Sequence, residues 1–280
     1  MLHGTFIANK ILDDLRSKTE KYKLQNKIPT LCVVQVIFDT ASKTYVKQKH
    51  KIAKSLEWNF IYDELPENTS EDKVIEILQA RSNDISVHGI ILQLPLPKHL
   101  NQNKLLQYIS PKKDVDGLTI TNQGKLLSNT AILKPCTPQG CLAILDEYNF
   151  SLKGKHVAIF GRSILVGKPL ALMLSDRGAT VSIINREDKN QASISQNANL
   201  ICIAIGQKHY LTSKHVNEKA WILDIGMNKS NDKWIGDVNT NITCAARTPV
   251  PGGVGPLTVA YLMKNTMIAF EKLENDVIQS

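Results

Sequence analysis

The stretch Lys43–Lys51, written KTYVKQKHK, places four lysines and one histidine in nine consecutive residues. A lysine amine becomes a general acid or base near neutral pH when loss of hydration lowers its pKa. The same composition is also typical of a solvated helix face, or of a surface that binds nucleic acid. The helical position of each lysine therefore bears on its function.

On a helix over residues 43–56, each residue advances by about 100°. One side of this helix carries Lys43, Lys47, Lys51 and Lys54. Lys49 falls on the opposite, apolar side, one turn after Tyr45. Two interpretations of Lys49 stay open: its stem lies along the core and its ammonium reaches water, or its desolvated amine is catalytic.

The loop Gly161–Pro169 (GRSILVGKP) follows a predicted strand and opens a predicted helix. Glycines there let the backbone approach a phosphate, and a helix N-terminus attracts its charge. The loop is not GxGxxG, because Ser163 replaces the second glycine. It is not a P-loop either, because five residues separate Gly161 from Gly167. An ordinary tight turn is the alternative.

Arg186 follows the next predicted strand. A site for NAD usually has an acidic residue at this point, whereas an arginine suits the 2′-phosphate of NADP. Arg186 and Arg162 could clamp that phosphate together. The neighbouring Glu187 and Asp188 weaken this distinction, and both arginines could be plain surface residues. The sequence favours NADP over NAD.

Two carboxylates lie one residue apart in Lys113–Gly117 (KDVDG). In an extended segment they point in opposite directions, so one could bind a ligand while the other fixes the loop. A simple Asx turn would have the same sequence.

These residues must be positioned by an alternating α/β chain. In the first half we expect helices over 3–25, 43–56 and from about 71, with strands at 31–36, 60–62 and 88–94. In the second half we expect strands at 156–160, 180–184, 200–205 and 221–225, with helices at 141–148, 169–178 and up to about 273. This alternation predicts an α/β fold with parallel, helix-covered sheets, and the second half opens like a nucleotide-binding unit.

Composition narrows the class of protein. The 280 residues are 42% hydrophobic, and the net charge of +8 favours anionic partners. The basic residues are spread along the chain with few aromatics, which argues against nucleic-acid binding. The start (MLHGTFIANKILDDL) has no signal-peptide pattern, and no apolar run is long enough for a membrane span.

The cysteines and histidines do not form metal-binding motifs. The five cysteines include no CxxC pair, which indicates a reducing cytosol without a disulfide framework or a zinc site. The seven histidines include no HExxH or HxH pair. We therefore expect no bound metal.

Eight stretches, in the same order, resemble the bifunctional methylenetetrahydrofolate dehydrogenase/methenyltetrahydrofolate cyclohydrolase family. They are ASKTYVKQK (41–49), GIILQLPLP (89–97), PKKDVDG (111–117), PCTPQG (135–140), GRSILVGKP (161–169), DIGMN (224–228), GDVN (236–239) and TPVPGGVGPLT (248–258). LQLPLP, KDVDG and PVPGGVGP are highly specific in combination.

The resemblance implies a role for each matching residue. Lys49 matches the catalytic lysine, Tyr45 its partner on the substrate ring, and Gln93 the glutamine that tunes the lysine. Asp116 matches the carboxylate that binds the pterin. The implied substrate-binding residues also include Leu92, Leu94 and the loop residues Pro251, Gly252, Gly253, Pro256 and Thr258. The implied dinucleotide site consists of Gly161, Arg162, Ser163, Val166, Gly167, Arg186 and Met227.

The resemblance also implies two domains with a cleft between them. Residues 1–120 would form an α/β catalytic domain that binds folate, and 121–280 a Rossmann-type NADP domain. A C-terminal helix at about 256–275 would pack back on the first domain. The implied enzyme is a cytoplasmic homodimer of one-carbon metabolism that needs no metal. It oxidises methylenetetrahydrofolate with NADP and hydrolyses the methenyl product to formyltetrahydrofolate.

The chain departs from the family pattern in the loop before the catalytic helix. Ile37 replaces a glycine and Thr40 a proline, with Phe38 between them. If the glycine has a positive φ, isoleucine would strain this loop. Asn185, Asn239 and Leu257 replace a histidine, an aspartate and a methionine. These changes leave open a monofunctional enzyme of the same fold, and a basic nucleic-acid-binding protein is the alternative from another class.

Overall fold

The computed structural model describes residues 1–37, 40–230 and 233–278, with only the backbone of 40–42, 45, 277 and 278. The chain divides into two compact units. The 135–261 unit contains Met1–Lys10 and Pro135–Tyr261, and the 11–134 unit contains Ile11–Lys134 and Leu262–Ser280. Two long helices, α1 (Thr5–Lys23) and α9 (Val254–Ile278), contribute residues to both units.

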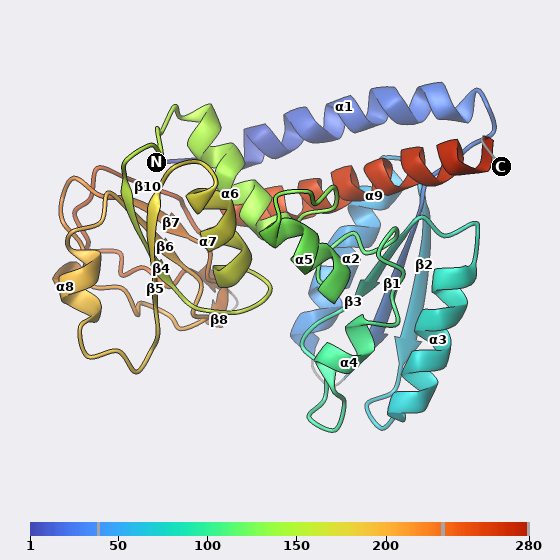
Figure 1. The fold of residues 1–280 in the computed structure, drawn as a ribbon, viewed down its shortest axis with the longest axis horizontal. Coiled ribbons are helices and arrows are strands. Elements are labelled where there is room, and N and C mark those ends of the chain that lie inside the picture. Colours follow the sequence, from blue (N-terminus) through green and yellow to red (C-terminus); the bar gives the residue numbers. More distant parts are fainter. Residues whose placement is uncertain (38–39, 231–232, 279–280) are drawn as a thin grey trace. The chain divides into compact units, whose positions relative to one another are not determined.

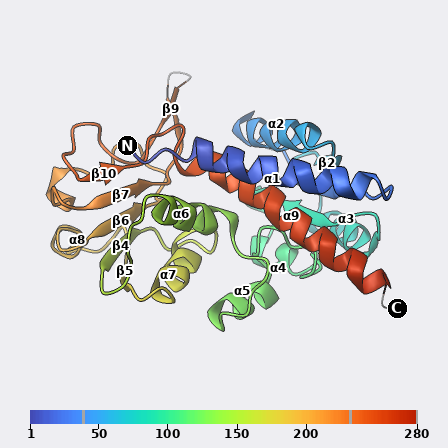
Figure 2. The same ribbon diagram turned by 90° about the horizontal axis from the view of Figure 1, so that it is seen from above.

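The 11–134 unit is built on a three-stranded parallel sheet in the order β2-β1-β3. Its strands are β1 (Thr30–Val36), β2 (Asn59–Leu65) and β3 (Gly89–Leu92), connected by α2 (Thr40–Ser55) and α3 (Glu71–Asn83). Every residue of β1 is buried, which explains its mainly apolar sequence, TLCVVQV. Figures 1 and 2 show α2 and α3 on opposite faces of the sheet. Because β1 is central, the chain reverses direction across the sheet between β1 and β3, which creates a topological switch point.

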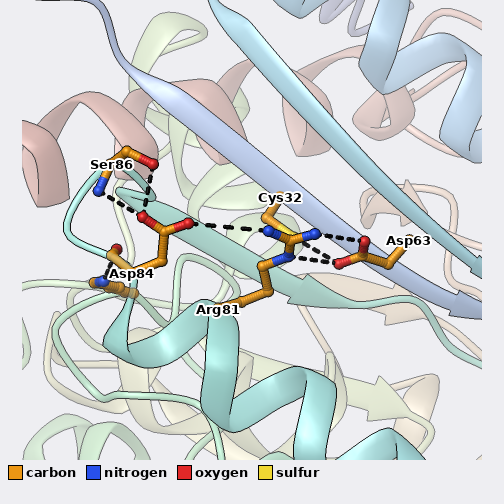
Figure 3. Close-up of polar contacts among 6 residues, drawn as sticks. Cys32, Asp63, Arg81, Asp84 and Ser86 are labelled. Carbon is orange, nitrogen blue, oxygen red and sulfur yellow. Dashed lines mark hydrogen bonds and ion pairs between the residues drawn. The ribbon is translucent and has the colours of Figure 1, made fainter.

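An ion-pair network fixes α3 to the edge strand β2 (Figure 3). The Nε and Nη2 atoms of Arg81 each donate to a carboxylate oxygen of Asp63 over 2.8 Å. The thiol of Cys32 lies 3.6 Å from the same carboxylate, and Asp84 lies 3.9 Å from the guanidinium. Such a two-pronged contact defines orientation as well as distance. Burial, and then the Asp63 charge, raise the pKa of the Cys32 thiol.

The 135–261 unit has a five-stranded parallel sheet in the order β10-β7-β6-β4-β5. Its strands are β4 (His156–Phe160), β5 (Thr180–Ile184), β6 (Leu200–Ile203), β7 (Trp221–Asp224) and β10 (Ala246–Arg247). Figure 1 shows α6 (Cys136–Glu147) and α7 (Gly167–Ser175) on one face, with α8 (Gln191–Ser195) on the other. The switch point here lies between β4 and β6. The predicted α/β fold with parallel sheets is confirmed in both units.

Two predicted helix starts differ from the structure. Helix α6 begins at Cys136, five residues before the predicted 141, so most of PCTPQG is helical. Helix α9 begins at Val254 rather than at about 256, so Pro256 and Thr258 belong to a helix and not to a loop. Pro138 and Pro256 each lie in a first turn, where a helix N–H has no intrahelical partner to lose. The prolines therefore do not interrupt these helices.

Several short elements were not predicted from the sequence. They are α4 (Gln102–Leu106), α5 (Ile120–Leu127), α8, the 3-10 turn η1 (Ser213–His215), the antiparallel pair β8 (Asn228–Ser230) and β9 (Lys233–Ile235), and β10. All five cysteines are free; four are buried and Cys244 is half-buried. No helix within the described residues is long and apolar enough to cross a membrane.

Candidate functional site

Lys49 meets Gln93 at the switch point of the 11–134 unit. The Lys49 Nζ atom lies 2.7 Å from Gln93 Oε1, and Gln93 Nε2 donates to the Leu94 carbonyl over 2.7 Å. The backbone N–H of Gln93 donates to Val34 on β1 over 2.8 Å. Gln93 is 8% exposed. Its carboxamide therefore has a fixed direction, with the oxygen presented to the amine.

Helix α2 separates its lysines as the helical spacing predicts. Lys47, Lys51 and Lys54 are exposed, whereas Lys49 is half-buried on the side of the buried Val46 and Ala53. Lys43, the fourth lysine predicted on the side opposite Lys49, pairs with Glu64 over 3.1 Å. Among these lysines, Lys49 is thus the one that the helix directs toward the end of β3.

The two carboxylates of KDVDG have different surroundings. Asp114 is 1% exposed and accepts backbone N–H bonds from Leu118 and Thr119, at 3.1 and 2.8 Å. Asn122 Nδ2 donates to the same carboxylate over 2.9 Å. Asp116 is half-buried. Of the two, Asp114 holds the loop together, while Asp116 is the less buried residue.

Two further side chains hold the segment that precedes Asp116. Asn265, fully buried on α9, donates from Nδ2 to the carbonyls of Val115 and Lys134 over 2.7 and 2.8 Å. The Lys113 Nζ atom donates to the Asp84 carbonyl over 2.7 Å, and burial lowers the pKa of this amine. The position of Asp116 is therefore set by its neighbours in the 11–134 unit.

Some predicted residues of this group contribute less or lie outside the description. Leu92 is 2% exposed and belongs to the core, whereas Leu94 is half-buried. The side chain of Tyr45, and Phe38 and Asp39 entirely, lie outside the described residues. Ile37 is described: its N–H continues the ladder to Leu65 over 2.9 Å, and it is not among the residues with positive φ. The strain considered for Ile37 is therefore absent.

The glycine loop lies at the switch point of the 135–261 unit. Gly161 directly follows β4 with φ +116°, and a Cβ atom there would be 2.6 Å from the carbonyl oxygen of Ala204, which directly follows β6. A Cβ on Gly167 would be 2.0 Å from the Gly161 carbonyl oxygen. Ser163 Oγ accepts the Val166 N–H over 3.1 Å. The loop is thus folded tightly on itself before α7 begins, as a dinucleotide site requires.

Arg186 lies in the loop after β5, the strand that pairs with β4. β4 and β5 pair with Phe160 opposite Ile184, so Arg162 and Arg186 each lie two residues beyond a paired position. Both side chains are exposed, and within the described residues neither forms an ion pair with a carboxylate. Glu187 is instead engaged by Asn185 Nδ2 over 2.7 Å. The two arginines are available to an anionic ligand.

The remaining predicted residues also belong to the 135–261 unit. Pro251 is exposed, Gly252 has φ +100°, and Gly253 is buried. Thr258 Oγ1 lies 3.0 Å from Thr137 Oγ1. A Cβ on Gly255 would be 3.4 Å from the Met227 sulfur, so Met227 lies against the first turn of α9.

Sequence reasoning missed a buried pair of acids in the same unit. Asp224 accepts the N–H groups of Asp237 and Val238 at 2.9 and 3.0 Å, and Asp237 accepts those of Ile205 and Gly206 at 2.8 and 2.9 Å. Burial raises the pKa of Asp224 to about 6. Both acids lie in stretches that carry the resemblance, DIGMN and GDVN, but no spacing rule marks them as a pair.

Comparisons with known proteins agree with this geometry. Residues 2–116 match the model of the tetrahydrofolate dehydrogenase/cyclohydrolase catalytic domain, and 135–274 match that of the NAD(P)-binding domain of the same enzymes. The bifunctional protein FolD of Thermodesulfovibrio yellowstonii is 42% identical over 283 residues, covering 100% of this chain and 99% of the relative. That of Ligilactobacillus salivarius is 41% identical over 97% of each chain.

Solved structures extend the similarity to three dimensions. The FolD methylenetetrahydrofolate dehydrogenase/cyclohydrolase of Campylobacter jejuni has a TM-score of 0.93 at 36% identity, covering 97% of this chain and 98% of the other. The Trypanosoma brucei FolD enzyme, solved with NADP and an inhibitor, has a TM-score of 0.91 at 28% identity and covers 96% of both chains. With both halves matched, the chain belongs to the bifunctional tetrahydrofolate dehydrogenase/cyclohydrolase family.

Proposed function

We propose that this chain catalyses both reactions of its family. It oxidises methylenetetrahydrofolate to methenyltetrahydrofolate with NADP, and it hydrolyses the methenyl group to formyltetrahydrofolate. The observation that carries the proposal is the 2.7 Å contact between Lys49 Nζ and Gln93 Oε1 at the carboxyl end of β3. Ligands of open parallel sheets bind at such a switch point.

Lys49 is the catalytic group of the hydrolytic step in this proposal. Water adds to the cationic methenyl carbon, the five-membered ring opens to the formyl product, and one proton is released. An amine at the edge of the core can take up that proton, because partial loss of hydration favours its neutral form. Gln93 fixes the amine through its oxygen. Tyr45 supplies a ring surface for the substrate, and Asp116 accepts N–H bonds from the pterin.

We also propose Leu94 as a substrate-binding residue of the 11–134 unit. In the 135–261 unit, we propose as substrate-binding residues Pro251, Gly252, Gly253, Pro256 and Thr258. Leu92 supports this site from the core, since its side chain is buried. We also propose the working domain boundary near residue 120, with the later part of α9 belonging to the folate domain. The grouping of Leu262–Ser280 with Ile11–Lys134 supports the placement of the later part of α9, whereas the compact units themselves divide at 134/135 and group Met1–Lys10 with Pro135–Tyr261.

The hydride step depends on alignment of the folate with a bound dinucleotide, which accepts the hydride from the methylene carbon. The residues of the glycine loop suit such a ligand: the backbone packs closely at Gly161 and Gly167, where α7 begins, and Ser163 holds the turn by accepting the Val166 N–H. Met227 belongs to the same unit. We propose NADP rather than NAD, because Arg162 and Arg186 are exposed in the loops that follow two neighbouring strands, β4 and β5. Two guanidinium groups suit a 2′-phosphate.

We further propose a cytoplasmic homodimer. Five free thiols are typical of a reducing compartment. β5 is the edge strand of its sheet, and Ile183 on it is 44% exposed. An edge strand with an exposed apolar residue is suited to pairing with a second copy. Sedimentation as a monomer at micromolar concentration would contradict the dimer.

The function is tested by a spectroscopic assay with methylenetetrahydrofolate and each dinucleotide. We expect absorbance of the methenyl product to appear with NADP faster than with NAD, and then to decay as the formyl product forms. Appearance without decay would identify a monofunctional dehydrogenase, and decay of added methenyl compound alone a monofunctional cyclohydrolase. Salt-sensitive binding of nucleic acid that depends on Lys47 and Lys51, without folate turnover, would favour the other class of protein.

A further inference from the structure

The loop that carries Arg186, residues 185–190, is held by contacts inside it and by side chains of α8, which follows it. At its end, the Ser193 hydroxyl donates to the Asn190 carbonyl over 2.9 Å. Asn185 Oδ1 accepts the Arg186 N–H over 2.8 Å, and Asp188 Oδ1 accepts the Asn190 N–H over 2.8 Å. These bonds are local. Taken alone, they shape the loop but do not fix it to the rest of the unit.

Gln191, the first residue of α8, makes the fixing contacts. Its Nε2 atom donates to the carbonyl oxygen of Asn185 over 3.0 Å and to that of Arg186 over 2.7 Å. One carboxamide thus holds two successive peptide groups, including that of the arginine itself. The exposed Arg186 side chain starts from a fixed backbone.

Gln191 is itself oriented by the core of the unit. Its Oε1 atom accepts a bond from the Tyr210 hydroxyl over 2.9 Å. The Tyr210 ring stacks on His215 with a centroid distance of 6.2 Å, and it meets Phe160 edge-on at 6.3 Å. Because Oε1 is taken by a donor, the amide nitrogen must face the two carbonyls. A chain of contacts therefore runs from the buried Phe160 to the loop.

We propose that Gln191 is a positioning residue for recognition of the NADP 2′-phosphate, acting through Arg186. The inference rests on the proposed NADP function and on the role of Arg186 in it. An arginine on a loose loop loses more conformational freedom when it binds than one on a fixed backbone. The two hydrogen bonds from Gln191 to the loop therefore strengthen binding of a ligand that carries the 2′-phosphate. They contribute little to binding of a ligand that lacks it.

The test uses equilibrium binding to the full-length protein by titration calorimetry, with 2′,5′-ADP and 5′-AMP as probes. Gln191→Leu should weaken binding of 2′,5′-ADP by about 3- to 10-fold, the usual effect of losing one or two net hydrogen bonds. Binding of 5′-AMP should change by less than about 2-fold. Tyr210→Phe removes only the hydroxyl that orients Gln191, and it should give a smaller change in the same direction.

Gln196→Leu is the matched control. Gln196 also donates from Nε2 to a backbone carbonyl, that of Lys214, over 2.8 Å, but within the described residues none of its hydrogen bonds reaches the 185–190 loop. Its loss should leave the ratio of the two affinities unchanged. In the double variant Arg186→Ala/Gln191→Leu, the affinity for 2′,5′-ADP should equal that of Arg186→Ala alone.

The outcomes separate the inference from the function on which it rests. If Arg186→Ala leaves the affinity ratio unchanged, the phosphate is held elsewhere, and both ideas fail. If Arg186→Ala changes the ratio but Gln191→Leu and Tyr210→Phe do not, only the positioning role fails. Equal weakening of both probes by Gln191→Leu would show a purely structural role and would also overturn the inference. If Gln191→Leu does not fold, Tyr210→Phe decides.

Discussion

The two parallel sheets have the same local strand order, but different kinds of groups lie at their switch points. In each, the first strand of the unit is flanked by the second and the third, so that a switch point opens beside it. In the 11–134 unit, two side chains lie at this point, those of Lys49 and Gln93. In the 135–261 unit, the backbone of Gly161 and Gly167 lies there, packed at distances that leave no room for a Cβ atom.

The difference teaches which substitutions each region tolerates. A site made of side chains fails when a functional group is removed, and a site made of close-packed backbone fails when an atom is added. Bond-making chemistry needs groups that exchange protons, whereas a phosphate needs N–H groups and space. The two units should therefore respond to opposite kinds of mutation.

The largest effect is expected at Lys49. Lys49→Met keeps the length of the stem and removes the amine, so cyclohydrolase turnover should fall by about 10²- to 10⁴-fold, the usual range for loss of general acid–base catalysis. The decay of methenyltetrahydrofolate, followed by absorbance, measures it. Lys47→Met on the exposed side of α2 is the control and should be fully active. An active Lys49→Met variant would refute the assigned role.

The next effect tests addition of an atom. Gly167→Ala places a Cβ 2.0 Å from the Gly161 carbonyl oxygen, so the loop must move. We expect dehydrogenase efficiency to fall by about 100-fold, as for a displacement of about 1 Å at a reacting complex. Gly124→Ala on α5, whose Cβ would meet nothing within 4 Å, is the matched control. Normal dinucleotide affinity in Gly167→Ala would mean that the loop does not hold the cofactor.

A smaller effect distinguishes the two acids of KDVDG. Asp116→Ala should weaken binding of folate by about 1.5–3 kcal/mol with little change in melting temperature, because a charged hydrogen-bond partner of the ligand is lost. Asp114→Ala should instead lower the melting temperature, since three buried donors lose their acceptor. Michaelis constants and thermal unfolding measure both. The opposite result for the pair would reverse the two roles.

The smallest effect concerns stability and pH in the 135–261 unit. The pKa of Asp224 is raised to about 6 in the folded protein, so the folded state binds more protons than the unfolded state between its unfolded and folded pKa values. Stability therefore falls as pH rises through this window. Relative to Asp224→Asn, the wild type should lose about 1 kcal/mol of unfolding free energy between about pH 5 and pH 7. The unfolding free energy is measured by urea unfolding at each pH. If the wild type and Asp224→Asn show the same change with pH, Asp224 makes no such contribution.

The sequence predicts more of the 11–134 unit than of the other one. Helical phase alone places Lys49 on the apolar side of its helix, because a charged residue on an apolar face is visible in the spacing, but it leaves the role of the amine open. Gln93 could not, since a glutamine after a strand has no local signal and came only from the resemblance. The spacing of Asp114 and Asp116 predicts that one acid binds a ligand and the other fixes the loop. Which acid fixes the loop depends on contacts with Asn122 and the following helix.

The missed elements share physical causes. α4 and α8 have five residues each, which is too short for a helical period to be seen. The starts of α6 and α9 lie earlier than predicted, and each helix has a proline in its first turn, a position that accepts it. The role of Asp237 depends on N–H groups of the distant residues Ile205 and Gly206, and that of Gln191 on the way the 185–190 loop folds back toward α8. No spacing along the chain reveals either role.

The buried thiols offer a way to follow each unit separately. Cys32 lies in the 11–134 unit, and Cys136, Cys141 and Cys202 in the 135–261 unit; all four are buried. An alkylating reagent can reach these sulfurs only when the surrounding structure opens, so the labelling rate of each peptide, read by mass spectrometry, reports the opening free energy of its own half. The half-buried Cys244 serves as the internal reference for the labelling rates of the buried thiols. The native chain thus carries probes of cooperativity between its halves, without any engineered label.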